Sequence, residues 1–597
     1  MLHKIIVIFS VINGCIHLSS SSKWHYQCTE GFCRKTLTTE NTTSLLSFAE
    51  CNLLCLNHAG VWPMPTGSIS VANLTEINIQ KFSFTTNQDT NISNSVEKAF
   101  HIFTSEIKSL VGCSAVLQAK NSNLASVQIN FQITDQSTKD IGLGTVETYT
   151  IETSSGNIIN VTIRAKTFFG ARHGLETLSQ LVIYDDLRGR VLFPANISVA
   201  DGPVYGWRGI MLDTARNYVT PKAIKRTLKA MAASKLNTFH WHLTDTSSFP
   251  YVSKSHPELA EYGAYSPNKV YTDATVRDII EYARVRGIRV VPELDAPAHV
   301  GEGWQSTGVT TCFDWTPWDK YCVEPPCGQF DPSREQLYDI LEDLYGDMLD
   351  QFGTNVFHMG GDEINLACWK ATANLTNWMV SEKGWDLEAA SFLTKVWPYF
   401  QSNAAKRLHK KAGKNVPIIL WSSDLTNQEN VTDILPPSDY IIQVWSSGSD
   451  SSIRTLLNKN YSIILSNSDA LYLDCGFAGW VTSGNNWCSP YKGWQTIYDN
   501  KPINIAVNKS NQVLGGETAL WTEEAGTSSL DSRLWPRSAA FAETLWTEPA
   551  TDWSEAEERM LLHRDRLVRL GIEADEIQPE WCFRNQQTCP ILGKFNN

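Results

Sequence analysis

Apolar segments alternate with helix-like segments from residue 205 onward, and functional-looking side chains follow each apolar segment. There are eight such segments, at 209–213, 238–243, 288–291, 356–359, 417–420, 440–444, 463–465 and 513–515. Helix-like stretches such as 221–234, 274–286 and 334–351 separate most of them, and Pro221 suits a first helical position. Eight β/α repeats over roughly 350 residues predict an α/β fold, the (β/α)8 TIM barrel.

The part of the chain before residue 200 has a different composition. Of the 21 tryptophans, only Trp24 and Trp62 precede residue 200. Strand-like runs at 127–133, 147–152 and 158–164 and a helix-like run at 170–182 predict a smaller α+β domain. We find no catalytic constellation there. The expected organisation is a supporting domain at 23–200 and a catalytic barrel at 201–597 that ends in a disulfide-stapled tail.

The N-terminus indicates the secretory route. Residues 1–22 combine Lys4, the apolar run 5–12 and small serines at 19–22, which is typical of a signal peptide. No later run is long and apolar enough for a transmembrane helix. Sequons for N-glycosylation agree with this route and lie at Asn41, Asn73, Asn91, Asn160, Asn196, Asn374, Asn430, Asn460 and Asn508. We therefore expect a secreted glycoprotein without a membrane anchor.

The cysteines cluster locally, which predicts disulfide bonds in an oxidising compartment. The clusters are Cys28, Cys33, Cys51 and Cys55; Cys312, Cys322, Cys327 and Cys368; Cys475 and Cys488; and Cys582 and Cys589. Thirteen of the 14 cysteines lie outside the signal peptide, so one is unpaired, and isolated Cys113 is the candidate. A zinc site at the first cluster is the alternative.

The net charge of the chain is −13, which argues against nucleic acid and anionic membranes as partners.

The stretch 354–365 carries the most unusual chemistry, since two adjacent carboxylates, Asp362 and Glu363, follow a predicted strand end. In a TIM barrel the active site lies at the carboxyl ends of the strands. Adjacent acids suit a reaction that needs an acid with a raised pKa beside an ionised partner. The preceding Gly360–Gly361 pair predicts a loose backbone. The alternative is a turn with two solvated carboxylates.

Aromatic side chains at other strand ends point to a carbohydrate pocket. Trp421, Trp445 and Trp521 end three different strands and would form a flat apolar box for the C–H faces of a sugar. Arg216, Asp474 and Glu523 could bind its hydroxyl groups. The competing interpretation is a zinc site at His240 and His242, which lie on one face of a strand. Such sites need further ligands from later strands, where this chain has tryptophans.

Four motifs together resemble glycoside hydrolase family 20, the β-N-acetylhexosaminidases. They are Asp-Thr-Ala-Arg-Asn at 213–217, His-Trp-His-Leu-Thr-Asp at 240–245, Pro-Glu-Leu-Asp-Ala-Pro-Ala-His at 292–299 and His-Met-Gly-Gly-Asp-Glu at 358–363. The resemblance covers the chain from the first domain to the C-terminus and implies a small α+β first domain. It also implies a retaining, exo-acting mechanism without a cofactor or metal, in which the acetamido oxygen of the substrate is the nucleophile.

The resemblance assigns roles to individual residues. Glu363 would be the general acid and then the base, Asp362 would hold the acetamide N–H, and Tyr472 would bind the acetamide oxygen. His299 and Asp245 would form a relay near Glu363. Six residues would bind the terminal sugar: Arg216, Asp474 and Glu523 through its hydroxyl groups, with Trp421, Trp445 and Trp521 as the walls.

Two loops suggest a longer binding strip. The loop 304–327 carries Trp315, Trp318, Val323 and Glu324, and the loop after the seventh strand carries Trp480, Trp487 and Trp494. This arrangement is similar to the insect chitinolytic type, in which Val323, Glu324 and Trp487 would meet a second sugar and Trp318 would extend the strip. Alternatives are an N-glycan-trimming or lysosomal hexosaminidase and, from another class, a catalytically silent cell-surface sugar-binding protein. The family type also implies a possible homodimer.

Overall fold

The computed structural model describes residues 23–39, 45–86, 89–112, 124–154, 156 and 158–589. The predicted signal peptide, Asn41 and Cys113 lie outside these residues, so the expectations placed on them stay predictions. Among the described helices, none is both long and apolar enough to cross a membrane.

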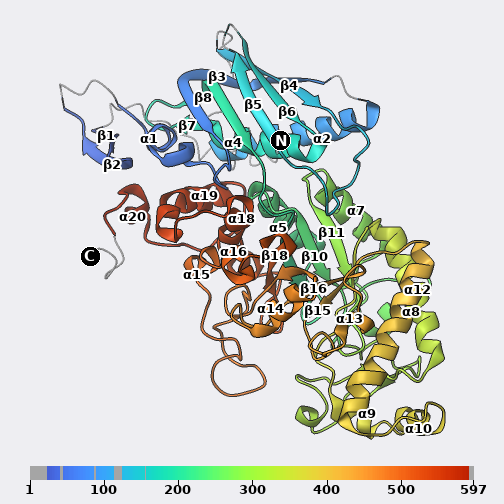
Figure 1. The fold of residues 1–597 in the computed structure, drawn as a ribbon. Helices are drawn as coiled ribbons and strands as arrows, with labels where there is room; N and C mark the ends of the chain where they lie inside the picture. Colours follow the sequence, from blue (N-terminus) through green and yellow to red (C-terminus); the bar gives the residue numbers. More distant parts are fainter. Residues whose placement is uncertain are drawn as a thin grey trace, which may run out of the picture.

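The first domain is built on a six-stranded sheet with the strand order β3-β4-β6-β5-β8-β7. Its strands are β3 (Ile69–Thr86), β4 (Ala125–Ile133), β5 (Tyr149–Ser154), β6 (Ile158–Ala165), β7 (Ile183–Asp185) and β8 (Arg190–Asp201). Helices α2 (Thr90–Val111) and α4 (Phe168–Leu181) lie between this sheet and the barrel (Figure 1). Every residue of α4 is buried, as expected for a helix that is covered on all sides. The expected α+β domain is confirmed.

The second domain is a closed barrel of eight parallel strands in the order β9-β10-β11-β14-β15-β16-β17-β18, with β18 pairing back to β9. The strands are β9 (Trp207–Asp213), β10 (Thr238–His242), β11 (Arg289–Glu293), β14 (Phe357–His358), β15 (Ile418–Trp421), β16 (Tyr440–Val444), β17 (Ser462–Leu465) and β18 (Val513–Leu520). The predicted barrel is confirmed. Its last strand is longer than expected and contains Glu517, which the sequence placed beyond the strand.

Helices follow most strands and cover the barrel. They include α5 (Pro221–Ala233), α7 (Asp273–Arg284), α8 (Glu335–Phe352), α12 (Trp397–Ala412), α14 (Ser451–Asn458), α16 (Pro502–Ala506) and α18 (Arg537–Thr547). The side chain of Thr220 accepts a hydrogen bond from the N–H of Ala223, and Pro221 occupies the first turn of α5. This N-cap and proline start the helix where the sequence predicts it.

The two ends of the described chain meet in a small cluster of their own. The hairpin β1 (Trp24–Thr29) and β2 (Phe32–Leu37), together with α1 (Phe48–Cys55), packs against α20 (Glu580–Arg584) through Tyr26, Phe48 and Phe583. The buried side chain of Gln586 accepts a hydrogen bond from the N–H of Cys33 at 2.7 Å. The stapled start therefore packs against the C-terminal tail.

Disulfide bonds join the described cysteines within the predicted clusters: Cys28–Cys55, Cys33–Cys51, Cys312–Cys368, Cys322–Cys327, Cys475–Cys488 and Cys582–Cys589. The zinc alternative for the first cluster is wrong, because its four thiols are consumed by two of these bonds. The described sequon asparagines are all exposed, as glycosylation requires.

A buried ion pair joins the two domains. Glu147, just before β5, accepts hydrogen bonds from both terminal nitrogens of Arg208 in β9, at 3.0 and 2.7 Å. Both side chains are almost completely buried. Asn237 also donates to Glu147 at 2.9 Å. The first domain is thus anchored to the amino-terminal end of the barrel, away from the strand ends that carry the predicted site.

Candidate active site

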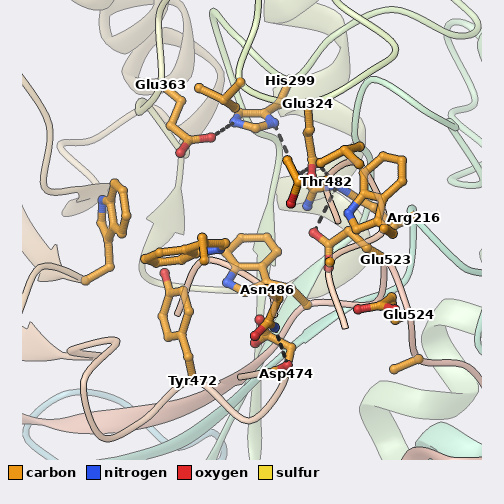
Figure 2. A pocket seen from close by; sticks show the side chains of 18 of the residues that line it. Arg216, His299, Glu324, Glu363, Tyr472, Asp474, Thr482, Asn486, Glu523 and Glu524 are labelled. Atoms are coloured by element: carbon orange, nitrogen blue, oxygen red, sulfur yellow. Dashed lines mark hydrogen bonds and ion pairs between the residues drawn. The ribbon is translucent and has the colours of Figure 1, made fainter. Parts of the chain in front are cut away.

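A cavity of about 480 Å³ opens at the carboxyl ends of the barrel strands (Figure 2). Its lining comes from loops after six of the strands. Of the predicted site residues, the structure brings together Arg216, His299, Trp318, Val323, Glu324, Asp362, Glu363, Trp445, Tyr472, Asp474, Trp487, Trp521 and Glu523. In Figure 2, Glu363 and His299 lie on one side of this space, and Tyr472 and Asp474 lie on the opposite side.

The turn after β14 is tightly held, which corrects the expectation of a loose backbone. Gly360 and Gly361 have φ angles of 62° and 89°. A Cβ atom on Gly360 would lie 1.6 Å from Oδ1 of Asp295, so a larger residue cannot be accommodated there. The N–H of Gly361 donates to the same Oδ1 at 2.9 Å. The glycines let the backbone approach Asp295 and turn the two following carboxylates toward the cavity.

Glu363 also has a left-handed backbone, with φ of 51°. Its Oε2 lies 3.3 Å from Nε2 of His299, whose Nδ1 lies 3.4 Å from Oδ1 of Asp245. His299 itself has φ of 59°. Strained backbone at two residues that face each other is typical of a functional site. The structure thus brings the three residues of the predicted relay into consecutive contact, with Asp245 outside the cavity lining.

Charges around the cavity shift several pKa values. Burial would lower the pKa of His299, but the carboxylates of Asp245 and Asp295 outweigh it and hold the pKa well above the ordinary value. Burial raises the pKa of Asp362, and the neighbouring Asp295 raises it further. The buried Asp362 Oδ1 has no hydrogen-bond partner in the described part of the chain. This free acceptor can take a donor from a ligand, and an N–H group would favour its ionised form.

Arg216 lies in the lining of the cavity. Its guanidinium group lies 2.9 Å from Asp245, donates to Glu324 at 2.8 Å, and is 4.0 Å from Glu523. The same group lies 5.0 Å from the ring centroid of Trp521. These contacts fix a cation in the cavity lining, beside acids that can accept hydrogen bonds from hydroxyl groups.

Aromatic rings form the walls. Trp487 packs edge-on against Trp445 and Tyr472, with ring centroids 6.0 and 5.9 Å apart. Trp421 differs from its prediction, because it lies beneath the wall rather than in it. Its ring is 5.8 Å from that of Trp521, its side chain is completely buried, and its N–H donates to Glu293 at 2.8 Å. As the last residue of β15, Trp421 packs into the barrel interior.

Two disulfide-closed loops complete the rim. Cys322–Cys327 closes the turn that carries Val323 and Glu324, and Cys475–Cys488 closes the loop that carries Trp487. Further lining residues were absent from the predicted set: Gly479, Val481, Thr482, Asn486, Glu524, Ala525 and Arg533. Most of them lie in the loop after the seventh strand or beside Glu523. The cysteines that close this loop, Cys475 and Cys488, were the sequence signal that could have extended the prediction along it. Trp480, which the sequence analysis placed on this loop without assigning it a role, also lines the cavity. Trp494 is buried and packs against Trp553.

The histidine pair on β10 is engaged by carboxylates. Nδ1 and Nε2 of His240 lie 2.9 Å from Glu517 and 2.9 Å from Glu293. Nδ1 and Nε2 of His242 lie 2.7 Å from Glu293 and 2.9 Å from Asp245. This geometry favours imidazolium–carboxylate pairing for these rings, in place of the zinc alternative. The absence of a metal stays a prediction.

Comparison with known proteins identifies the family. Residues 205–549 match the model described as the catalytic domain of glycosyl hydrolase family 20, and residues 61–181 match the model described as beta-acetyl hexosaminidase like. The chain belongs to glycosyl hydrolase family 20. It is therefore a glycoside hydrolase, and the catalytically silent alternative is not supported.

Relatives of this family 20 enzyme match along almost its whole length. It is 48% identical to a chitooligosaccharidolytic beta-N-acetylglucosaminidase of Ostrinia furnacalis, covering 95% of each chain. It is 47% identical to the protein of the same name in Bombyx mori, covering 97% of this chain and 98% of that one. Among solved structures, a Flavobacterium johnsoniae chitobiase is similar, with a TM-score of 0.67, 28% identity, and coverage of 86% of this chain and 73% of that chain.

Proposed function

We propose that this enzyme is an exo-acting, retaining β-N-acetyl-D-hexosaminidase that removes terminal non-reducing N-acetylglucosamine, and N-acetylgalactosamine, from chitin oligosaccharides. The observation that carries the proposal is the lining of the cavity. The side chains of Arg216 and Glu523 are 9% and 18% exposed in this lining, whereas Trp487 is 68% exposed. The buried charged part fits one terminal sugar, while the exposed aromatic mouth fits the rest of a linear chain.

The carboxylates fit substrate-assisted hydrolysis. The acetamido oxygen of the substrate attacks C1 while the glycosidic oxygen takes the proton of Glu363 and leaves. The product is a cyclic oxazolinium ion. Glu363, now ionised, removes a proton from water as the water attacks C1, which opens the ring with retained configuration. His299, 3.3 Å from Glu363, is placed to support both proton transfers.

Asp362 and Tyr472 fit the two ends of the acetamide. The unpartnered Oδ1 of Asp362 accepts the acetamide N–H and balances the positive charge that develops on the ring. Burial holds the pKa of Tyr472 well above its ordinary value, so its hydroxyl stays protonated and can donate to the acetamide oxygen. Both side chains line the cavity.

The mouth of the cavity favours a linear substrate. Trp487 is 68% exposed although it packs against Trp445, so one face of its ring is free for a second sugar. Val323, also exposed, and Glu324 line the same cavity, and Trp318 extends the strip. The names of the two moth relatives agree with chitin oligosaccharides as substrates.

The cellular setting is proposed from the disulfide bonds and the glycosylation sequons. The described disulfides and exposed sequons support secretion, with the lysosome as the alternative destination. Activity recovered from culture medium would support secretion, whereas activity confined to a lysosomal fraction would support the alternative. The homodimer implied by the family type stays a prediction, and light scattering of the purified protein tests it.

Substrate choice is tested by kcat/KM on a linear β-1,4-linked N-acetylglucosamine oligomer and on a branched N-glycan with terminal N-acetylglucosamine. We expect a strong preference for the linear oligomer, and we expect Trp487→Ala to reduce that preference. Equal rates on the two substrates, unchanged by Trp487→Ala, would favour glycan trimming or lysosomal turnover.

A further inference from the structure

A chain of alternating carboxylates and imidazoles runs from the cavity into the interior of the barrel. It starts at Glu363 and ends at Glu517. The links are Glu363–His299 at 3.3 Å, His299–Asp245 at 3.4 Å, Asp245–His242 at 2.9 Å, His242–Glu293 at 2.7 Å, Glu293–His240 at 2.9 Å and His240–Glu517 at 2.9 Å. Only the first three residues belong to the relay derived above.

The inner four residues have no contact with solvent. His240, His242, Glu293 and Glu517 are each 0% exposed. The fold makes room for them, since a Cβ atom on Gly209 would lie 2.6 Å from Cγ of Glu517. Buried ion pairs often contribute no more stability than apolar residues of similar volume. A chain of them that leads to the reacting carboxylate therefore suggests a role in the reaction.

The contacts define the protonation of the rings. Both nitrogens of His242 and Nδ1 of His240 lie at hydrogen-bond distance from carboxylate oxygens. Nε2 of His240 lies 2.9 Å from Glu293 as an ion pair without hydrogen-bond geometry. These contacts favour the imidazolium form of both rings. Burial opposes these charges, but the carboxylates raise the pKa of His240 to about 9 and hold that of His242 well above its ordinary value. Cations and anions then alternate along the chain from His299 to Glu517.

We propose that His240, His242, Glu293 and Glu517 are positioning residues for the hydrolytic reaction. Their alternating charges hold Asp245 as an anion and His299 as a cation against Glu363, and thereby set the pH range in which the general acid keeps its proton. This inference rests on the proposed role of Glu363 as the general acid.

Other groups also face the chain. Arg216 lies 2.9 Å from Asp245 and 3.4 Å from Nδ1 of His299. Asp295 and Asp362 lie beside His299, with polar side-chain atoms of the three within 4.8 Å of one another. Glu293 also accepts from Trp421 and lies 3.1 Å from Nδ1 of His358. The His358 ring stacks on His240 at 4.3 Å, and burial lowers its pKa. Trp207 and Gln443 donate to Glu517. These groups also affect the pH range of activity, but they are the same in every variant. The test therefore compares two variants that remove charges of opposite sign.

The test measures kcat/KM against pH on 4-nitrophenyl N-acetyl-β-glucosaminide for His242→Gln and Glu293→Gln. Removing a cation from the chain makes it harder to ionise a nearby acid, and removing an anion makes it easier. We expect the alkaline limb of the profile to move to higher pH in His242→Gln and to lower pH in Glu293→Gln. Loss of a single buried charge this close to Glu363 should move the midpoint of the alkaline limb by about half a pH unit or more.

His173→Gln is the matched control, because His173 also pairs with a buried carboxylate, Glu147, at 2.8 Å, but lies in the first domain. We expect this variant to lose stability without moving the limb. If His242→Gln or Glu293→Gln does not fold, His240→Gln and Glu517→Gln give the same two directions from the inner end of the chain. The proposal is overturned if the alkaline limb stays in place in these variants. It is also overturned if the limb moves in the same direction whether a cation or an anion is removed.

One measurement needs no variant. In protein labelled with 15N-histidine at pH 7.5, the chain predicts at least three rings with both nitrogens protonated, from His240, His242 and His299. Fewer such rings would overturn the proposal. If the unaltered protein does not hydrolyse the glycoside at all, the proposed function fails; if it does and the variants leave the limb unmoved, only the positioning role fails.

Discussion

At the scale of single residues, the two adjacent acids differ in access. The Glu363 side chain is 30% exposed, whereas Asp362 is buried. We expect Glu363→Gln to lose about 10²- to 10⁴-fold in kcat, because the amide cannot protonate the leaving oxygen, while the sugar still binds. Stopped assays and calorimetry with N-acetylglucosamine measure the two effects. Glu335→Gln on the surface of α8 is the control, and near-normal turnover of Glu363→Gln would refute the assignment.

Asp474 predicts a pH dependence of sugar binding. Burial raises its pKa to about 7, and its buried Oδ1 has no hydrogen-bond partner among the described residues. The ionised form predominates above that pKa and accepts a stronger hydrogen bond from a hydroxyl group. We therefore expect KM to rise about fivefold, or ~1 kcal/mol, as the pH falls through 7. The rise should be absent in Asp474→Asn. A KM that varies equally in both proteins would assign the titration to another group.

Residue chemistry was predictable where a side chain ends a strand. Arg216, Glu363 and Tyr472 lie in the cavity as expected. Trp421 was placed wrongly because sequence position gives the end of a strand but not whether the ring points into the barrel or the cavity. The contacts of the inner acids Glu293 and Glu517 were not predictable, since their partners come from other strands and become neighbours only when the barrel closes.

At the scale of elements, a short disulfide-closed turn lies beside the proposed second-sugar site. Cys322 and Cys327 enclose Val323, Glu324 and two prolines, 325–326. We expect the double substitution Cys322→Ser and Cys327→Ser to leave kcat/KM on an aryl glycoside within about twofold but to lower it on linear oligomers. The physical reason is that freeing the turn adds an ordering cost when a chain binds.

The matched control for this turn is the double substitution Cys582→Ser and Cys589→Ser, which opens a comparable short loop in the C-terminal tail. It should leave the ratio of oligomer to aryl-glycoside activity unchanged. Equal losses on both substrates in the Cys322→Ser and Cys327→Ser protein would mean that the turn supports the terminal-sugar site instead.

Element type followed well from periodicity, but element length did not. β14 is only two residues long because the left-handed turn at Gly360 ends it, whereas β18 continues through Glu517 to Leu520. A continuous pairing of β18 with β9 sustains the longer strand, and such pairing depends on barrel closure rather than on local sequence.

At the scale of the whole molecule, the domains depend on a buried ion pair. We expect Glu147→Gln to lower the free energy of unfolding by about 3–5 kcal/mol, because it leaves Arg208 buried without its carboxylate. Thermal unfolding measures the loss. Glu152→Gln, which breaks an exposed pair with Arg164 in the same domain, should change stability by less than about 1 kcal/mol. Similar losses in the two variants would show that burial of the interdomain pair adds nothing.

The two-domain plan was predictable from the change in composition near residue 200 and from the β/α repeats. The meeting of the chain ends was not, because the pairing of Gln586 with Cys33 spans almost the entire sequence and leaves no local signal.

The central claim is that the acetamido oxygen of the substrate, and not Asp362, attacks C1. The most direct measurement is kcat/KM for aryl glycosides whose acetamido group carries no, one, two or three fluorine atoms. Fluorine withdraws electron density from the carbonyl oxygen, so the account predicts a steep and steady fall along the series. A flat series would contradict it and assign the nucleophile to the enzyme.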